Sequence, residues 1–222
     1  MLTPKIIHPW DCSPKEAIAL QESLASHVST KGSLANAETV AGIDVGIRGK
    51  RARAAVVVIA LKDLATLEIA RAERPVTFPY VPGLLTFREG PVVLDALAKL
   101  TTEPDVLLFD GQGRAHPRRM GLATHIGVLL DYPSVGCAKS RLCGTYEEPG
   151  QERGEYTLLY EDGEVVGAVL RTRTRVKPVF VSTGHRASLE AAIDLVLRCG
   201  SGVKLPEPTR RAHHAASFAG SG

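Results

Sequence analysis

Three acidic side chains lie among neighbours that would solvate a free carboxylate poorly. Asp44 interrupts the apolar run 40–47, Asp110 ends the run 106–109, and Glu89 stands near the start of a predicted helix. An ionised carboxylate in such surroundings is costly unless it is paired or bound to a cation. Carboxylate oxygens are also the ligands that Mg²⁺ and Mn²⁺ prefer. The three acids therefore predict a metal site able to activate water and stabilise a leaving oxygen in phosphodiester hydrolysis.

Each acid also has an ordinary structural explanation. Asp44 could form a salt bridge with an arginine in the core. Asp110 could cap a helix or close a turn, as aspartates at strand ends often do. Glu89 could complement the macrodipole from the first turn of its helix. These interpretations stay open until the distances between the three carboxyl groups are known.

The elements that must position these acids follow from the spacing of apolar residues and from turn signals. A capping box at Ser13 begins the first predicted helix. Helices are expected over residues 14–28, 87–100 and 117–130, with another capped by Ser188 and stopped by Gly200. Strands are expected over residues 40–47, 54–61, 66–76, 106–109, 134–138, 156–160, 165–171 and 179–182. Strands that cluster first and then alternate with helices predict an α/β fold, with a central mixed β-sheet and helices on both faces.

The chain length predicts one domain. The 222 residues suffice for a single compact unit with a sizeable core, and neither an internal repeat nor a second domain is visible. We therefore expect one domain over residues 1–222. The Ala/Ser/Gly-rich tail is expected to fray from about residue 212 and to be flexible after about residue 214.

Composition limits the partners and the compartment. Charged residues make up 23%, and the formal net charge of +3 permits a polyanion partner without requiring one. Four cysteines without C-x-x-C spacing indicate reduced thiols. The longest apolar run, residues 54–61, is too short to span a bilayer, and the N-terminus lacks a signal-peptide core. We therefore expect a cytoplasmic protein with no membrane partner.

Basic residues gather in three clusters that could neutralise phosphates. An equally plausible interpretation is that each is a solvated surface face. The clusters are Arg48, Lys50, Arg51 and Arg53; Arg114, His116, Arg118 and Arg119; and Arg171, Arg173, Arg175 and Lys177.

The segment Pro79-Tyr80-Val81-Pro82 is a rigid apolar turn with an aromatic side chain at its tip. Two prolines restrict its backbone, which suits a wedge that enters a stack of nucleic-acid bases. The alternative is a turn that only packs against its own protein.

Several segments, in a fixed order across roughly residues 8–214, resemble the endonuclease V family. PYVPGLLTFRE, residues 79–89, is similar to the family motif PYxPGxLxFRE and is highly specific. FDGQGRAHPR, residues 109–118, resembles the D-G-x-G-x-x-H-P segment. Residues 41–45 match the first catalytic strand, residues 136–142 the V-x-K-x-x-L region, and residues 205–210 the L-P-E-P-T-R signature.

This resemblance implies a ribonuclease H-like fold and a deoxyribonuclease V activity in DNA repair. The implied reaction is hydrolysis, with Mg²⁺ or Mn²⁺, of the second phosphodiester bond on the 3′ side of deoxyinosine. It leaves a 3′-hydroxyl and a 5′-phosphate. The implied partner is DNA containing deoxyinosine, bound by a monomer. Some relatives prefer inosine in RNA, so an inosine-specific endoribonuclease is the alternative.

The resemblance also implies a role for individual residues. Asp44 and Asp110 look like direct metal ligands, and Glu89 looks like the third acid. His213 matches a histidine beside the metal and the attacking water, although a solvated tail residue would look the same. Lys139 suits the scissile phosphate, or is simply a surface lysine after a strand. The other implied phosphate contacts are Arg88, His116 and Arg118. The implied base wedge and pocket consist of Pro79, Tyr80, Val81, Pro82, Gly83, Leu85, Gly111 and Leu142.

Two other classes of protein share part of this pattern. The segment 42–46 also resembles the first phosphate loop of actin-like ATPases, but those enzymes need about twice this length and a second glycine-rich loop. A non-catalytic module that binds inosine is the other class, and the presence of all three acids argues against it. Metal-dependent cutting distinguishes the enzyme from the module.

Overall fold

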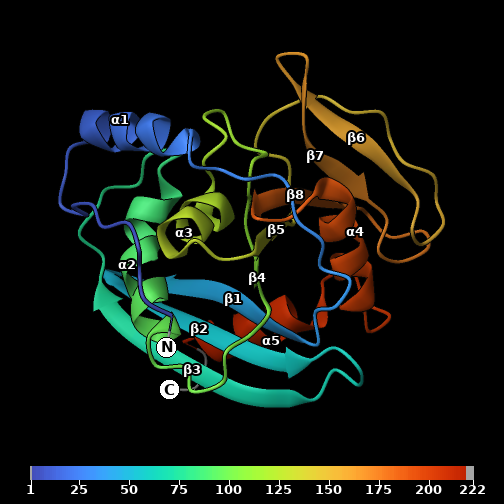
Figure 1. The fold of residues 1–222 in the computed structure, drawn as a ribbon, viewed down its shortest axis with the longest axis horizontal. Coiled ribbons are helices and arrows are strands. Elements are labelled where there is room, and N and C mark those ends of the chain that lie inside the picture. The colour runs from blue at the N-terminus through green and yellow to red at the C-terminus, as the bar shows by residue number, and fades with distance from the viewer. Residues whose placement is uncertain (1, 219–222) are drawn as a thin grey trace.

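The computed structural model describes residues 2–218, and these form one eight-stranded sheet with five helices. The strand order is β3-β2-β1-β4-β5-β8-β7-β6 (Figure 1). The strands are β1 (Thr39–Arg48), β2 (Arg51–Ala60), β3 (Thr66–Pro75), β4 (Val106–Phe109), β5 (Ser134–Ala138), β6 (Tyr156–Glu161), β7 (Glu164–Leu170) and β8 (Val179–His185). The helices are α1 (Pro14–Ala25), α2 (Leu85–Leu97), α3 (Leu122–Leu130), α4 (Leu189–Arg198) and α5 (Glu207–Ala216). The predicted mixed α/β sheet is confirmed.

Parallel pairing at the centre of the sheet brings the predicted site residues to one edge. β4 lies parallel to β1 with Ile43 opposite Phe109, so Asp44 and Asp110 take the next position on adjacent strands. The Asp110 amide donates to the Ile43 carbonyl at 2.9 Å, which fixes this register. β5 lies parallel to β4 with Gly136 opposite Phe109, so Lys139 follows on the same edge.

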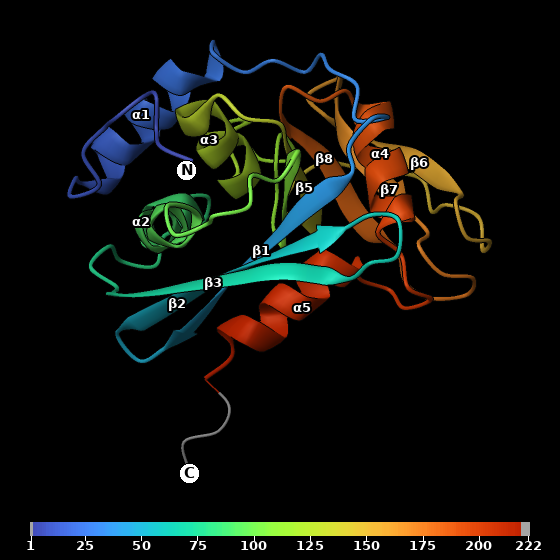
Figure 2. The same ribbon diagram turned by 60° about the horizontal axis from the view of Figure 1, so that its bottom comes forward.

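Helices cover both faces of the sheet, as predicted. Buried side chains of α2 and α3 pack on one face against β1, β2 and β4. Buried side chains of α4 and α5 pack on the other face. Figure 2 shows α2 and α5 on opposite sides of the β1–β3 part of the sheet. Residues 54–60 of β2 are buried throughout, which accounts for the continuous apolar run in that strand.

Two predicted helix starts are displaced in the structure. α3 begins at Leu122 rather than at residue 117, because Arg119 adopts φ +57° and Gly121 packs directly against the backbone of Gln112 and Gly113. α2 begins at Leu85, two residues earlier than predicted. Glu89 therefore lies in the second turn of α2 rather than at its start, and the first-turn explanation of this acid is wrong.

The prediction that the tail frays from about residue 212 is wrong for residues 213–216, because α5 continues to Ala216. Residues 219–222 of that predicted flexible tail lie outside the described residues. Within residues 2–218, no helix is both long and apolar enough to cross a membrane.

Candidate active site

Two aspartates and a histidine converge where β1, β4 and α5 meet. Asp44, Asp110 and His213 each offer one ligand atom, and these atoms all lie within 4.8 Å of one another. His213 Nδ1 lies 2.7 Å from Asp44 Oδ2, within hydrogen-bond distance. The two carboxyl groups are largely buried, whereas the imidazole is half-exposed. A hydrogen bond to Asp44 orients the ring and leaves Nε2 available to another group.

Two glycines of β1 allow α5 to reach this position. A Cβ at Gly42 would lie 2.1 Å from the Pro208 carbonyl carbon, and one at Gly46 would lie 2.5 Å from the Ala216 carbonyl oxygen. Backbone contacts of this kind cannot accommodate a side chain. Because β1 has no side chain at these two positions, α5 packs closely across it and carries His213 to Asp44.

Asp110 keeps an unsatisfied oxygen in this cluster. Lys139 Nζ lies 2.6 Å from Asp110 Oδ2, yet the pair is not aligned as a hydrogen bond, and Oδ2 is buried with no hydrogen-bond donor. An ion pair that is not aligned as a hydrogen bond still leaves a lone pair of this oxygen unfilled. A buried carboxylate oxygen of this kind is one that a metal ion would satisfy.

Glu89 completes the acidic group from α2, although it lies outside the closest set of ligand atoms. The residue as a whole is only half-buried, but protein atoms surround its carboxyl group. Burial is the main cause that raises its pKa to about 8; Asp44 and Asp110 add to the rise, and Arg88 opposes it. Burial, together with Asp110, also raises the pKa of Asp44. Repulsion among the three carboxyl groups contributes to these raised pKa values, and a hard divalent cation held by the carboxylate oxygens would relieve it.

A cavity of about 350 Å³ opens beside Asp110 and Lys139. The structure brings most of the predicted wedge and pocket residues to its wall. Those that line it are Tyr80, Val81, Pro82, Gly83, Leu85, Gly111 and Leu142, together with His116. Pro79 does not line it.

The rim of the cavity is a type II turn over residues 81–84. The Leu84 amide donates to the Val81 carbonyl at 3.0 Å, Pro82 occupies the second position, and Gly83 has φ +77° in the third. Proline followed by glycine is what this turn requires. Tyr80, just before the turn, is 74% exposed, and the Arg88 guanidinium lies 5.7 Å from the centre of its ring. The aromatic tip therefore projects into solvent with a cation beside it.

Three of the predicted phosphate contacts have other partners in the structure. Arg88 lies beside Tyr80 and donates to the Phe78 carbonyl at 3.4 Å. His116 is buried, and both His116 and Arg118 donate to the Gly83 carbonyl oxygen. Lys139 alone of the four is exposed and beside the acids.

Sequence reasoning missed several residues of this cavity. Gln112 donates to the Ser140 carbonyl at 2.9 Å, and its Oε1 is buried without a partner. In the sequence, Gln112 stands between Gly111 and Gly113 and close to Asp110, and this position indicates a residue near the site. The other wall residues that were not predicted are Thr86, Gly121, Leu122, Ala138, Ser140 and Arg141.

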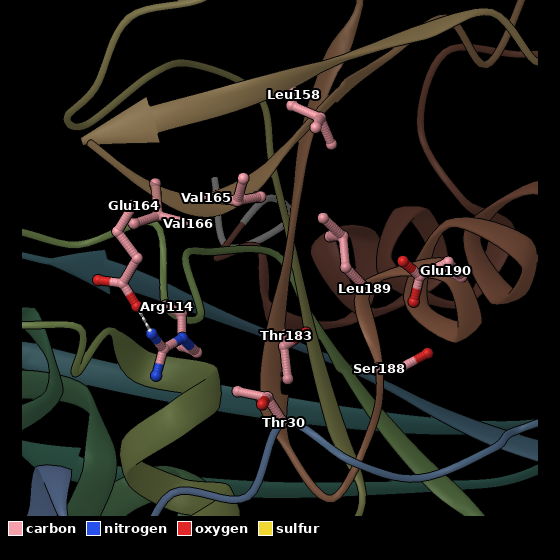
Figure 3. Close-up of a pocket in the computed structure, with 11 residues that line it drawn as sticks. Thr30, Arg114, Leu158, Glu164, Val165, Val166, Thr183, Ser188, Leu189 and Glu190 are labelled. Carbon is pink, nitrogen blue, oxygen red and sulfur yellow. Dashed lines mark hydrogen bonds and ion pairs between the residues drawn. The ribbon is translucent and has the colours of Figure 1, made fainter. Parts of the chain in front are cut away.

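A second cavity, of about 430 Å³, lies between the β6–β7 hairpin and the start of α4 (Figure 3). Its charged lining residues are Arg114, Glu164 and Glu190. Glu164 forms ion pairs with Arg114 and Arg119, so its charge is balanced. None of the clustered acids lines this cavity, and we therefore place the candidate site at the first one.

Comparison with known proteins gives a consistent result. The family model of endonuclease V matches residues 22–214. The chain is 54% identical to an endonuclease V of Methanothrix thermoacetophila, over 94% of this chain and 93% of that one. The crystal structure of endonuclease V from Streptomyces avermitilis superposes with a TM-score of 0.90 at 41% identity, covering 95% of this chain and 94% of that one.

A further neighbour contains nucleic acid. A variant of Ciona intestinalis endonuclease V, in complex with a 23mer DNA that contains an inosine followed by a ribo-adenosine, superposes with a TM-score of 0.80. It is 27% identical, and the match covers 92% of this chain and 97% of that one.

Proposed function

The chain belongs to the endonuclease V family, and we propose from this premise that it hydrolyses the second phosphodiester bond 3′ to a deoxyinosine in DNA, with Mg²⁺ as cofactor. Mn²⁺ would substitute. The observation that carries the proposal is the convergence of Asp44, Asp110 and His213 beside a cavity large enough to hold a nucleobase. The Ciona relative, whose structure holds DNA containing inosine, supports the choice of base.

Asp44 and Asp110 would hold the cation, with Glu89 as a further acidic ligand or a partner of bound water. When bound, the metal supplies a polarised water and a positive charge beside the leaving oxygen. His213, oriented by Asp44, would position the attacking water through its free nitrogen. The water oxygen forms a new bond to phosphorus, and the bond from phosphorus to O3′ breaks. The oxygen that leaves takes up a proton, so the products are a 3′-hydroxyl and a 5′-phosphate.

Lys139 would offset the charge that develops on the scissile phosphate. Its ammonium group is half-exposed and lies beside Asp110, where a phosphate next to the metal would also lie. Preorganised positive charge of this kind is among the largest contributions to phosphoryl-transfer catalysis.

The cavity would read the base through backbone groups. Hypoxanthine needs a donor toward O6 and an acceptor for its ring N–H, and adenine presents the opposite pattern. Among the described residues, the Leu85 and Thr86 amides at the start of α2 form no hydrogen bond within the protein, and both residues line the cavity. Gln112 also lines the cavity, and its buried Oε1 is an acceptor without a partner among the described residues. A base that leaves such groups unpaired is rejected at a cost of roughly 1–3 kcal/mol for each.

The test uses matched duplexes that differ at a single nucleotide. Deoxyinosine, deoxyadenosine or deoxyguanosine is placed in the same labelled DNA strand, and the products are sized with Mg²⁺ and with EDTA. We expect one cut, at the second bond 3′ to deoxyinosine, only with metal. Asp110→Asn serves as the inactive control. Binding to deoxyinosine without cutting in Mg²⁺ or Mn²⁺ would instead indicate a non-catalytic module.

Inosine in RNA is the second candidate substrate, because the strand held by the Ciona relative carries a ribonucleotide next to the inosine. The same set of duplexes made in RNA decides between them. Faster cleavage of the RNA set would make the chain an inosine-specific endoribonuclease.

A further inference from the structure

One carbonyl oxygen at the rim of the cavity receives three hydrogen bonds. The oxygen of Gly83 accepts from His116 Nε2 at 2.9 Å, from Arg118 Nη2 at 2.9 Å and from Gln21 Nε2 at 3.1 Å. A carbonyl oxygen has two lone pairs, so three donors saturate it. The donors come from α1 and from the segment after β4, both far from Gly83 in the chain.

Gln21 ties these segments together from inside the protein. Its side chain is fully buried on α1, and its Nε2 also donates to the Met120 carbonyl at 3.1 Å. Its Oε1 accepts from Arg118 Nε at 2.6 Å. The arginine can only donate, which fixes which end of the amide is oxygen. Nε2 therefore donates two hydrogen bonds and Oε1 accepts one, and the orientation of the amide is determined.

His116 completes the network as a neutral ring. Its Nδ1 accepts from the Arg118 amide at 3.1 Å, so Nε2 must carry the proton donated to Gly83. Burial, with the charges of Arg118 and Arg119, lowers the pKa of His116 to about 4, consistent with the neutral form. The buried ring and the saturated carbonyl make this group a support for the turn rather than a surface for phosphates.

A side chain at position 83 would disturb the turn. Gly83 has φ +77°, and a Cβ there would lie 2.8 Å from Arg118 Nη2. The next residues, Leu85 and Thr86, line the cavity and have amides without a hydrogen bond among the described residues, and Tyr80 precedes the turn. A shift of the Gly83 carbonyl would therefore displace both the aromatic tip and the amides.

We propose that Gln21, His116 and Arg118 are positioning residues that fix the 81–84 turn and thereby set the base selectivity of the cavity. The selectivity half of this inference rests on the proposed function. The three side chains act through Gly83, and neither Gln21 nor Arg118 lines the cavity. Gln21 belongs to a helix that carries none of the three site acids, so its effect on binding should be separable from the metal site.

The experiment compares Gln21→Met, which keeps the volume but loses the hydrogen bonds, with Glu22→Met on the exposed face of the same helix. Affinity for deoxyinosine and deoxyguanosine duplexes is measured by fluorescence anisotropy in EDTA, where no cutting is needed. Hydrogen exchange of residues 78–87 is measured on the free protein. We expect Gln21→Met to reduce the preference for deoxyinosine about tenfold and to speed exchange at the Leu84 amide, while Glu22→Met leaves both unchanged.

Gln21→Glu separates the donor from the acceptor. It keeps an oxygen for Arg118 but places a carboxylate against the carbonyls of Gly83 and Met120, so we expect a loss of preference at least as large as in Gln21→Met. In Mg²⁺, both variants should raise KM for the deoxyinosine duplex while kcat changes less than about threefold.

The outcomes separate the two proposals. A folded Gln21→Met that keeps wild-type preference and wild-type exchange overturns the positioning role. Equal loss of kcat on every duplex, with selectivity intact, also overturns it, because that pattern indicates general destabilisation. A wild-type chain that binds all duplexes equally refutes the proposed function and the selectivity assignment with it; exchange at Leu84 then still decides whether the network holds the turn.

Discussion

Burial and neighbouring carboxyl groups both favour the protonated form of Glu89. The pKa of this acid is raised to about 8, against about 4.5 in an unfolded chain. The folded protein without metal therefore binds a proton here more tightly than the unfolded chain does. The contribution to stability is largest below the unfolded pKa and is lost as the pH rises toward 8. Bound Mg²⁺ would reverse this loss by stabilising the carboxylate.

We expect the metal-free protein to lose roughly 3–4 kcal/mol of unfolding free energy between pH 5 and pH 9 through this group. Glu89→Gln should remove most of that difference. Urea unfolding in EDTA at several pH values measures both. If the unfolding free energy of Glu89→Gln depends on pH as strongly as that of the wild type, Glu89 does not carry the effect and is ionised in the metal-free protein.

Tyr80 should matter for binding and little for folding. Its side chain is 74% exposed and contacts Arg88 only as a cation beside the ring, so Tyr80→Ala should lower the unfolding free energy by less than about 1 kcal/mol. Stacking of an aromatic side chain on a base contributes roughly 1–3 kcal/mol, so affinity for deoxyinosine duplexes should fall about tenfold or more. Calorimetry measures the unfolding free energy, and fluorescence anisotropy measures the affinity. Unchanged affinity would contradict the role of Tyr80 as a wedge between bases.

At the scale of elements, α5 depends on one buried acid. Glu207 accepts hydrogen bonds from Arg210, Arg211 and Ser201 and is almost fully buried. The bonds from Arg210 are the main cause that lowers its pKa to about 2, and those from Arg211 and Ser201 add to them against the opposing effect of burial. This contribution to stability is complete above about pH 4.5 and disappears as the pH falls toward 2.

Glu207→Gln should therefore destabilise the protein at pH 7 by roughly 2–3 kcal/mol, and by clearly less at pH 3. The matched control is Glu190→Gln, an exposed acid in the first turn of α4, which should change stability by less than about 0.5 kcal/mol. Chemical denaturation at the two pH values checks both. An equal effect of Glu207→Gln at pH 7 and pH 3 would contradict the ionised network.

Elements with a regular pattern could be predicted from the sequence, and those fixed by close contacts could not. The strands β1, β2 and β4 follow from apolar runs, and their register places Asp44 and Asp110 together. α5 was missed because its composition is polar and its stability comes from Glu207 and from the two glycines of β1. Gln21 was missed for a similar reason: nothing in an α1 glutamine indicates contact with residue 83.

At the scale of the whole molecule, ion pairs neutralise only some members of the basic clusters, since Arg48 and Lys50 of the first cluster are exposed and form none within residues 2–218. Arg51 and Arg53 pair with Glu73, and Arg114 and Arg119 pair with Glu164. In the third cluster Arg171 is buried, but the exposed side chains that follow it form no ion pair within residues 2–218. These are Arg173, Arg175 and Lys177.

Two hydrogen bonds link the start of this segment to the candidate site through Lys204. Thr172 donates to the Lys204 carbonyl at 2.6 Å, and Lys204 Nζ donates to the Lys139 carbonyl at 3.4 Å. We name Lys204, Lys177, Arg175 and Arg173 the basic strip, and we expect the phosphates of the bound strand to follow it away from Lys139.

Replacing Lys177 and Lys204 with glutamine should weaken binding to all duplexes alike. A plot of the logarithm of the binding constant against the logarithm of the salt concentration should have a shallower slope. The slope should change by about 0.7–0.9 for each phosphate that no longer has a lysine beside it. The control replaces Lys15 and Lys62, two exposed lysines that form no ion pair among the described residues and belong to neither the strip nor the cavity. Anisotropy titrations from low to high salt measure the slope. An unchanged slope in the strip variant would place the nucleic acid elsewhere.

Asp44 and Asp110 are proposed to hold a hard cation jointly. Calorimetric titration of Mn²⁺ into the free protein, compared with Asp44→Asn and Asp110→Asn, measures this binding, with Asp63→Asn as an exposed control away from the site. We predict that either active-site substitution weakens Mn²⁺ binding by tenfold or more while the fold and the control remain unaffected. Wild-type affinity in both variants would contradict the metal assignment.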